Sequence, residues 1–229
     1  MSPSPVDGYE PTELTIPTRS RERASYDRAG VHAILDEGWL CHLGFVRDGA
    51  PVVLPTLYAR VGEALYLHGS TGSRPLRGAK AAGGPGLPVC VTVTHVDGLV
   101  LAKSAFHHSI NYRSVVVHGT AHDVTDPEER RIALDALVDQ VVPGRSADSR
   151  PADRKEHAAT AVIRVDLEQV SAKSRTGGPN DEEGDAGLPH WSGVVPVRTA
   201  YGVPVPGPWT DAGAALPEYL VTGPRAATP

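Results

Sequence analysis

The chain has 229 residues, with 22 lysine and arginine residues against 27 aspartate and glutamate residues, and its formal net charge is −5 at pH 7. This charge balance provides no basic surface for nucleic acid or for an anionic membrane, so we expect neither as a partner. The two cysteines, Cys41 and Cys90, stand in apolar runs without CxxC spacing, which excludes a zinc ribbon or a thioredoxin-type redox pair.

The first predicted elements are one short helix and three strands. Asp27 can cap a helix that Gly38 ends, and its apolar face carries Val31, Ile34 and Leu35. Strands are predicted at 39–46, 51–59 and 64–68, separated by the turn signals Asp48-Gly49 and Gly62-Glu63. Turns this short require antiparallel neighbours, because a parallel crossover needs a dozen or more residues.

The following segment mixes helix and strand signals. Ser73 can cap a short helix over 73–82, and strands are predicted at 88–95 and 99–103 with Asp97-Gly98 as the turn between them. Residues 104–112 are ambiguous, with a helical turn as one interpretation. Residues 114–124 return to strand character.

A helix and a last strand complete the predicted elements. Asp126-Pro127-Glu128-Glu129 combines a cap, a proline at the first helical position and a glutamate three residues after the cap. The helix ends at Pro143-Gly144, and its apolar stripe consists of Leu134, Leu137, Val138 and Val141. Residues 160–167 alternate as a half-buried strand, whereas 145–155 and 176–187 read as long loops.

Together, these predicted elements indicate a mainly β protein with peripheral helices (α+β), in which six or seven antiparallel strands close into a barrel. Without alternating βαβ units, a doubly wound fold is disfavoured. Proline and glycine crowd both ends of the chain. We therefore expect an N-terminal arm at 1–19, one domain at 20–197, and a Pro/Gly-rich C-terminal tail at 198–229.

One stretch carries a chemical signal. Residues 65–74 run from a strand through a turn of small residues to a hydroxyl and a guanidinium that open a helix, with Arg77 one turn further on. A helix N-terminus with Ser73 and two arginines suits a phosphate, and a plain polar turn is the alternative. Arg113 and Ser114 offer a second guanidinium and hydroxyl before a strand.

The ten histidines do not form a metal site in this interpretation. His118 and His122 lie on a predicted strand, where four residues span about 13 Å, too far to share one ion. His107 and His108 are adjacent, so on a helix their side chains diverge by roughly 100°. We expect no protein-bound metal ion.

The order of these segments resembles a known family. Val53-Leu54-Pro55-Thr56, the strand from Tyr66 to Ser70, the Ser73-Arg74 turn and Arg113-Ser114-Val115 follow one another as in FMN-binding split β-barrel proteins. These include pyridoxamine phosphate oxidases and nitroimidazole reductase-like proteins. Residues 171–175 and 190–196 also look like the C-terminal part of this family, so the resemblance covers roughly 20–197.

The resemblance implies an antiparallel split β-barrel of FMN-binding type, a homodimer with FMN at the subunit interface, and a small-molecule substrate. It implies His68 as the catalytic candidate, with Lys173 or Arg175 as a positive charge beside the flavin ring. The implied cofactor-binding residues are Val53, Leu54, Pro55, Thr56, Leu67, His68, Gly69, Ser70, Ser73, Arg74, Arg77, Arg113, Ser114, Val115, Lys173 and Trp191.

Two departures point away from pyridoxamine phosphate as the substrate. The true oxidases carry a basic residue where Thr56 stands, and an arginine-containing segment where this chain has 192–196. The nitroimidazole reductase-like branch fits better. It implies an FMN-dependent oxidoreductase or flavin reductase that acts on a small conjugated substrate through flavin N5.

Alternatives remain open for the cofactor and for turnover. Related split barrels bind haem, for which His68, His107 or His108 would be the axial ligand. A deazaflavin could replace FMN, and a binding or sensor protein without turnover would also suit the few visible catalytic side chains. Because the sequence shows neither a secretory signal nor a stretch long enough to cross a bilayer, we expect a soluble, cytoplasmic protein.

Overall fold

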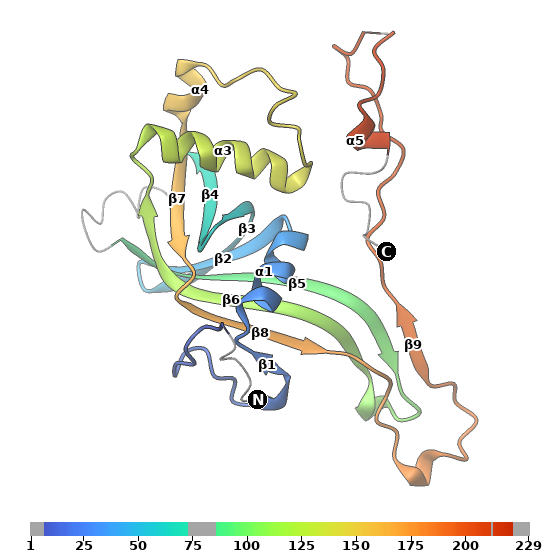
Figure 1. Cartoon of the computed structure of the whole chain (residues 1–229). Coiled ribbons are helices and arrows are strands. Elements are labelled where there is room, and N and C mark those ends of the chain that lie inside the picture. Colours follow the sequence, from blue (N-terminus) through green and yellow to red (C-terminus); the bar gives the residue numbers. More distant parts are fainter. Residues whose placement is uncertain (1–6, 73–85, 212, 222–229) are drawn as a thin grey trace, which may run out of the picture.

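The computed structural model describes residues 7–72, 86–211 and 213–221 (Figure 1). Most of these residues belong to one antiparallel sheet. The helix expected at 73–82 lies outside the described residues.

Six strands of this sheet close into a barrel: β2 (Leu40–Arg47), β3 (Ala50–Val61), β4 (Ala64–Ser70), β5 (Leu87–Leu101), β6 (Ser109–Asp123) and β7 (Thr160–Asp166). Around the barrel, β6 pairs with β7, β7 with β4, β4 with β3, β3 with β2 and β2 with β5, and a β5–β6 pairing completes the ring. Every pairing is antiparallel. The predicted mainly β barrel is confirmed.

The barrel is split because its two longest strands change neighbours along their length. The second half of β6 pairs with β7, and its first half pairs with β8 (Gln169–Arg175). Likewise β5 pairs first with β2 and then with β9 (Gly193–Pro196). Strands β5 and β6 therefore continue beyond the barrel as a curved ribbon flanked by β8 and β9 (Figure 1), with β1 (Ala24–Ser25) paired to β8.

The turn expected at Asp97-Gly98 is wrong. Strand β5 runs through this dipeptide without reversing, and the register against β6 shifts between Val96 and Gly98 as at a β-bulge. Glycine fits here because a Cβ on Gly98 would lie 2.9 Å from a Val194 side-chain atom. The chain reverses later, at the 3-10 helix η2 (Ala105–His107), inside the segment that the sequence left ambiguous.

Alternate residues of the strands fill the barrel with one apolar core, including Leu43, Tyr58, Leu67, Val91, Val117 and Ile163. Helix α1 (Arg28–Glu37) adds the predicted face of Val31, Ile34 and Leu35 to this core. The Asp27 side chain caps the helix by accepting a hydrogen bond from the Gly30 amide at 2.6 Å, and Gly38 follows its end. These predictions are confirmed.

A second, smaller core lies outside the barrel under α3 (Pro127–Val141). It joins Ala133 of this helix to the outer faces of β4 and β7, including Tyr66 and Val162. As the sequence predicted, Asp126 caps α3 by accepting from the Glu129 amide at 2.8 Å. The loop expected at 145–155 is wrong at its end, because α4 (Arg154–Ala159) begins there with a capping box between Asp153 and Glu156.

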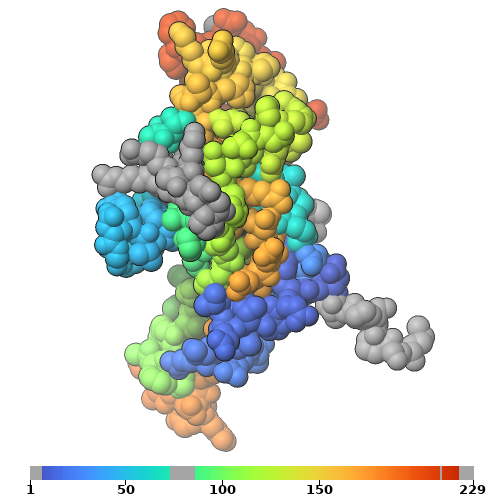
Figure 2. All heavy atoms as spheres, turned by 90° about the vertical axis from the view of Figure 1, so that its left-hand side faces the viewer, coloured from blue at the N-terminus to red at the C-terminus, as the bar shows by residue number. Residues whose placement is uncertain are grey.

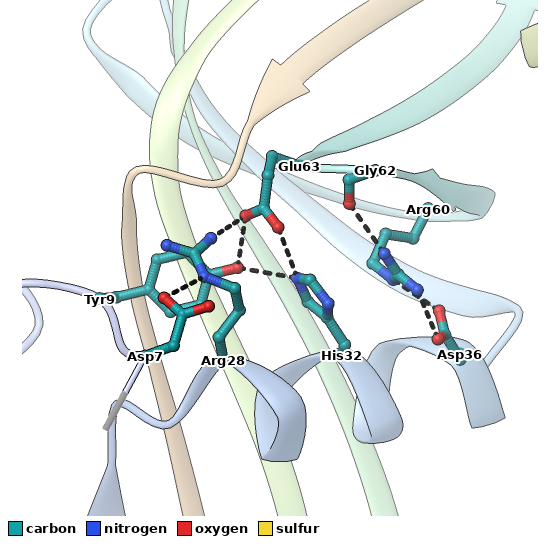
Figure 3. A network of polar contacts seen from close by, with 8 residues as sticks. All are labelled: Asp7, Tyr9, Arg28, His32, Asp36, Arg60, Gly62 and Glu63. Carbon is teal, nitrogen blue, oxygen red and sulfur yellow. Dashed lines mark hydrogen bonds and ion pairs between the residues drawn. The ribbon is translucent and has the colours of Figure 1, made fainter. Parts of the chain in front are cut away.

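The described part of the N-terminal arm docks on the barrel. Tyr9 is buried, and its hydroxyl donates to Glu63 at 2.9 Å in the turn between β3 and β4. Arg28 of α1 joins the same carboxylate and also bonds Asp7 at 3.1 Å (Figure 3). This network ties together three segments that are far apart in sequence.

After β9 the chain forms an extended C-terminal arm, residues 198–221, which ends in α5 (Glu218–Val221). Figure 1 shows the arm running from the ribbon, beside the barrel, to the level of α3. In Figure 2, red C-terminal residues emerge beside the yellow segment that contains α4. Within the described ranges, no helix is long and apolar enough to cross a membrane.

Candidate functional site

An apolar cavity of about 550 Å³ lies on the outer face of the barrel, bordered by α3, the 145–152 segment and α4. Leu57 of β3 and His68 of β4 form its floor. The side chains from the covering segments are Leu134, Asp135, Leu137, Val138, Val141, Val142, Arg145, Ser146, Ser149, Arg150, Pro151, Ala152, Glu156, His157 and Thr160. This volume is in the range of small-molecule and cofactor sites.

His68 reaches this cavity because side chains alternate along β4. Leu67 points into the barrel core, and His68 therefore points outward, as Tyr66 does toward α3. The His68 Nδ1 atom is buried without a hydrogen-bond partner among the described residues. Burial lowers the pKa of the imidazole, which keeps it neutral with a lone pair free at one ring nitrogen.

The apolar stripe of α3 lines the cavity instead of packing fully into the core. Of its four predicted members, Leu137 is 4% exposed whereas Val138 is 41% exposed, and all four belong to the cavity wall. The apolar stripe of a surface helix ordinarily faces the core of the protein. The partial exposure leaves an apolar wall that a bound apolar ligand would cover.

Two guanidinium groups lie at the cavity wall in the segment between α3 and α4. Arg145 donates to Asp148 at 3.1 Å and to the Tyr219 hydroxyl at 3.0 Å. Arg150 donates to Glu156 at 2.7 Å. Each guanidinium has five N–H donors, so both retain donors for an anionic group of a ligand.

A second, polar cavity of about 560 Å³ lies beside β1 and the end of β8. Its lining residues are Glu22, Arg23, Ala24, Ser25, Ser174, Arg175, Thr176, Gly177, Gly178 and Asn180. Arg175 is buried and donates to Asn111 Oδ1 at 2.5 Å and to the carbonyls of Gly177 and Gly178 at 3.3 and 2.9 Å. These acceptors are neutral, so the guanidinium charge favours an anion nearby.

The residues that the resemblance assigned to the flavin occupy several places. On β3, Val53 is 62% exposed, Leu54 and Pro55 are also exposed, and Thr56 is half-buried. On β4, Gly69 is half-buried, and the exposed Ser70 accepts from the Gly72 amide at 3.2 Å. Ser73, Arg74 and Arg77, assigned to the phosphate, lie outside the described residues.

A further group lies where β6 pairs with β8. Arg113 is held by Glu37 and Asp97, and its hydrogen bond keeps the pKa of the Glu37 carboxyl below its ordinary value. Ser114 donates to the carbonyl of Lys173, whose ammonium group in turn donates to the Arg19 carbonyl at 2.9 Å. Val115 belongs to the core. Any flavin contact by this buried valine must therefore be made by its backbone.

Trp191 lies apart from both groups, just before β9. Its indole is exposed and stacks against Gly193, where a Cβ would lie 2.8 Å from the ring. The register of β5 with β9 places it beyond Leu101, on the ribbon outside the barrel. The single chain therefore does not join Trp191 to His68, and the assignments of these residues to a flavin site stay predictions.

The other histidines named from the sequence make local contacts. His107 forms an ion pair with Glu182 at 3.4 Å when protonated, and His108 Nδ1 bonds the Ser104 carbonyl oxygen at 3.0 Å. In the described part of the chain, no group of three or more histidine, cysteine or acidic side chains is placed to hold a metal ion.

Sequence reasoning missed the cavity under α3 and the second imidazole in its wall, His157. The spacing of Asp153 and Glu156 was a signal for α4. No pattern in the sequence brings this helix over β4, because that depends on how the 145–152 segment folds back.

Comparison with known proteins gives the family and the fold. A family model described as pyridoxamine 5′-phosphate oxidase matches residues 27–174. The structure of a 5-nitroimidazole antibiotic resistance protein from Bacteroides thetaiotaomicron, described as putative, superimposes with a TM-score of 0.53 at 21% identity, covering 66% of this chain and 85% of that one. No curated protein matches.

Two solved structures resemble nearly the whole chain. The flavocytochrome Anf3 from Azotobacter vinelandii is 36% identical, with a TM-score of 0.85, over 93% of this chain and 98% of that one. The FAD and haem binding protein from Mycobacterium smegmatis is 40% identical, with a TM-score of 0.80, over 87% of this chain and 96% of that one. Both alignments extend beyond the family match, since 87% of this chain exceeds the 148 residues at 27–174.

Proposed function

This chain belongs to the pyridoxamine 5′-phosphate oxidase family, and from that premise we propose that it is a flavin-dependent oxidoreductase that also carries haem. The observation that carries the proposal is the likeness, over nearly full length, to a flavocytochrome and to a protein that binds FAD and haem. The sequence left flavin and haem open as alternative cofactors. The two relatives favour both cofactors in one chain.

The flavin would be a nucleotide whose identity the family leaves open. FMN is the prediction from the sequence, whereas FAD is named for the relative at 40% identity, so we favour FAD. The polar cavity supports an anionic cofactor, because Arg175 is buried there with neutral hydrogen-bond acceptors. Deazaflavin remains the third candidate.

The haem proposal has its own support in this chain. The buried Nδ1 of His68 lacks a hydrogen-bond partner among the described residues, and a neutral imidazole is the commonest ligand that proteins give to haem iron. The residues present therefore fit a haem group. Haem exchanges single electrons, which a flavin can supply after taking two from a donor.

The chain's own part in such chemistry is binding and electrostatics. Barrel strands would hold the flavin rigidly, and the Lys173 ammonium, on β8 next to the polar cavity, would favour negative charge on a reduced ring. The α3 stripe would keep water from an apolar cofactor. A small conjugated molecule is the proposed oxidant or substrate, and a binding protein without turnover is the alternative.

We also propose that the chain forms a homodimer. Between its ends, the C-terminal arm carries Val203 at 90% and Trp209 at 96% exposure, and residues 199–210 include no charged side chain. Val46 and Val53 are likewise exposed on β2 and β3. In a two-fold dimer each chain would supply both an arm and a strand surface, so apolar areas of both kinds would be covered together.

Identification of the bound cofactors tests this function. Protein purified from cells supplied with iron and a haem precursor is denatured, and the released compounds are separated by chromatography and weighed by mass spectrometry. The proposal expects one flavin nucleotide and one haem per chain. Haem with no flavin would contradict the assignment as a flavin-dependent oxidoreductase. Flavin with no haem would contradict the proposal that the chain also carries haem.

A further inference from the structure

We propose that the apolar cavity under α3 is the haem site and that His68 supplies an axial ligand to the iron. This inference rests on the proposed function and deepens it, since neither the family match nor the names of the relatives locate a haem. It also gives His68 a different role from the flavin contact that the resemblance implied.

The first argument is the state of the His68 side chain. Buried polar atoms in proteins nearly always have hydrogen-bond partners, and each exception needs an explanation. Nδ1 of His68 is such an exception among the described residues, and the residue lines the cavity. A neutral, uncommitted imidazole at the floor of a cavity is the form that binds iron.

The second argument is the shape and polarity of the cavity. The volume of about 550 Å³ is in the range of cofactor sites. Besides His68, the lining includes four aliphatic side chains of α3, namely Leu134, Leu137, Val138 and Val141. A porphyrin needs such apolar faces on both sides of its ring.

The third argument is the pair of cations in the wall. Haem carries two propionate groups, and planar guanidinium groups bind carboxylates through two parallel hydrogen bonds. Arg145 and Arg150 lie in the segment that covers the cavity, and the hydrogen bonds given above use only part of their donors. They are placed to bind the propionates while the apolar ring lies under α3.

The other histidines that the sequence offered as haem ligands do not line this cavity. His107 pairs with Glu182, and His108 bonds a backbone carbonyl oxygen on the ribbon outside the barrel. Neither residue lines the apolar cavity or the polar one. His157 does line the apolar cavity, so it is the residue against which His68 must be tested.

The experiment measures haem and flavin separately in four proteins: the wild type, His68→Ala, His157→Ala and His107→Ala. The Soret absorbance reports haem, and chromatography of the released cofactor reports flavin. We expect His68→Ala to lose the Soret band of the purified protein while its flavin content stays that of the wild type. His157→Ala and His107→Ala should keep the band.

Imidazole rescue distinguishes a lost ligand from a damaged fold. Added haem and free imidazole should restore a low-spin spectrum to His68→Ala, because imidazole can enter the space that the substitution leaves. Loss of the band in His157→Ala but not in His68→Ala would overturn the proposal. Loss of flavin instead of haem in His68→Ala would return His68 to the flavin site. A wild type without haem would contradict the proposed function itself.

Discussion

Arg145 donates a hydrogen bond to the hydroxyl of Tyr219 at 3.0 Å, and this contact joins the end of the C-terminal arm to the wall of the apolar cavity. Tyr219 also donates to Asp148, so one tyrosine bridges both members of the Arg145–Asp148 ion pair. The arm is thus fixed at β9 and again at α5. Changes in the arm are expected to reach the cavity through this tyrosine.

The first prediction concerns this bridge. Tyr219→Phe removes the hydroxyl and should release α5, while the exposed site limits the loss of stability to at most about 1 kcal/mol. Limited proteolysis should then cut the arm several-fold faster than in the wild type. Tyr201→Phe is the matched control in the same arm, and equal cleavage of both variants would show that the bridge does not hold the arm.

The second prediction concerns assembly. Deleting residues 198–229 should convert a dimer to a monomer at concentrations where the full chain is dimeric, as measured by light scattering. Trp209→Ser should weaken the dimer in the same direction because Trp209 is almost fully exposed in the single chain. Thr210→Ala, its neighbour, is the control. An unchanged dimer after the deletion would assign the interface elsewhere.

The third prediction concerns the stripe of α3. Leu137→Ala should lower the free energy of unfolding of the haem-free protein by about 2–3 kcal/mol, because Leu137 is 4% exposed. Ile132→Ala, at 41% exposure on the same helix, should change it by no more than about 0.5 kcal/mol. Denaturant titration of both variants measures the difference, and equal losses would contradict the orientation of α3.

The fourth prediction concerns pH. Burial lowers the pKa of His68 from its ordinary value of 6.5, so the unfolded chain binds more protons there than the folded chain does as pH falls below about 6.5. This contribution to stability is complete above that pH and is lost on acidification. In the haem-free protein, His68→Gln should therefore flatten the fall in unfolding free energy between about pH 6.5 and the lowered pKa.

The control for this measurement must account for the other titratable groups of the cavity. These are Asp135, Arg145, Arg150, Glu156 and His157. His157→Gln removes a second imidazole from the same wall and leaves His68 in place. An equally steep pH dependence in the wild type and in His68→Gln would mean that His68 does not titrate differently on folding.

Local patterns predicted the barrel well because the strands alternate and the caps are explicit. Asp27 and Asp126 both accept hydrogen bonds from helix amides as their positions in the sequence indicated. The Asp97-Gly98 signal misled because glycine serves a β-bulge as readily as a turn. Pairing of β5 with β6 along its whole length, a non-local interaction, decided between the two.

The candidate site was less accessible from sequence. The sequence identified His68 as a flavin contact and, with His107 and His108, as an alternative haem ligand. No spacing in the chain shows that α3 and α4 cover it. From the sequence, Arg113 was expected to bind the cofactor. In the fold it is paired with Glu37 and Asp97, which lie 76 and 16 residues away in the sequence. The pairing of charges and the enclosure of cavities depend on contacts between distant segments, which local patterns do not encode.

The measurement that tests the account most directly is the absorption spectrum of the purified wild-type protein, before and after anaerobic reduction. The account predicts the two visible bands of an oxidised flavin together with a Soret band. Reduction should bleach the flavin bands and shift the Soret band. A protein that shows neither cofactor, even after flavin and haem are added, would contradict the proposed function while leaving the barrel fold unchanged.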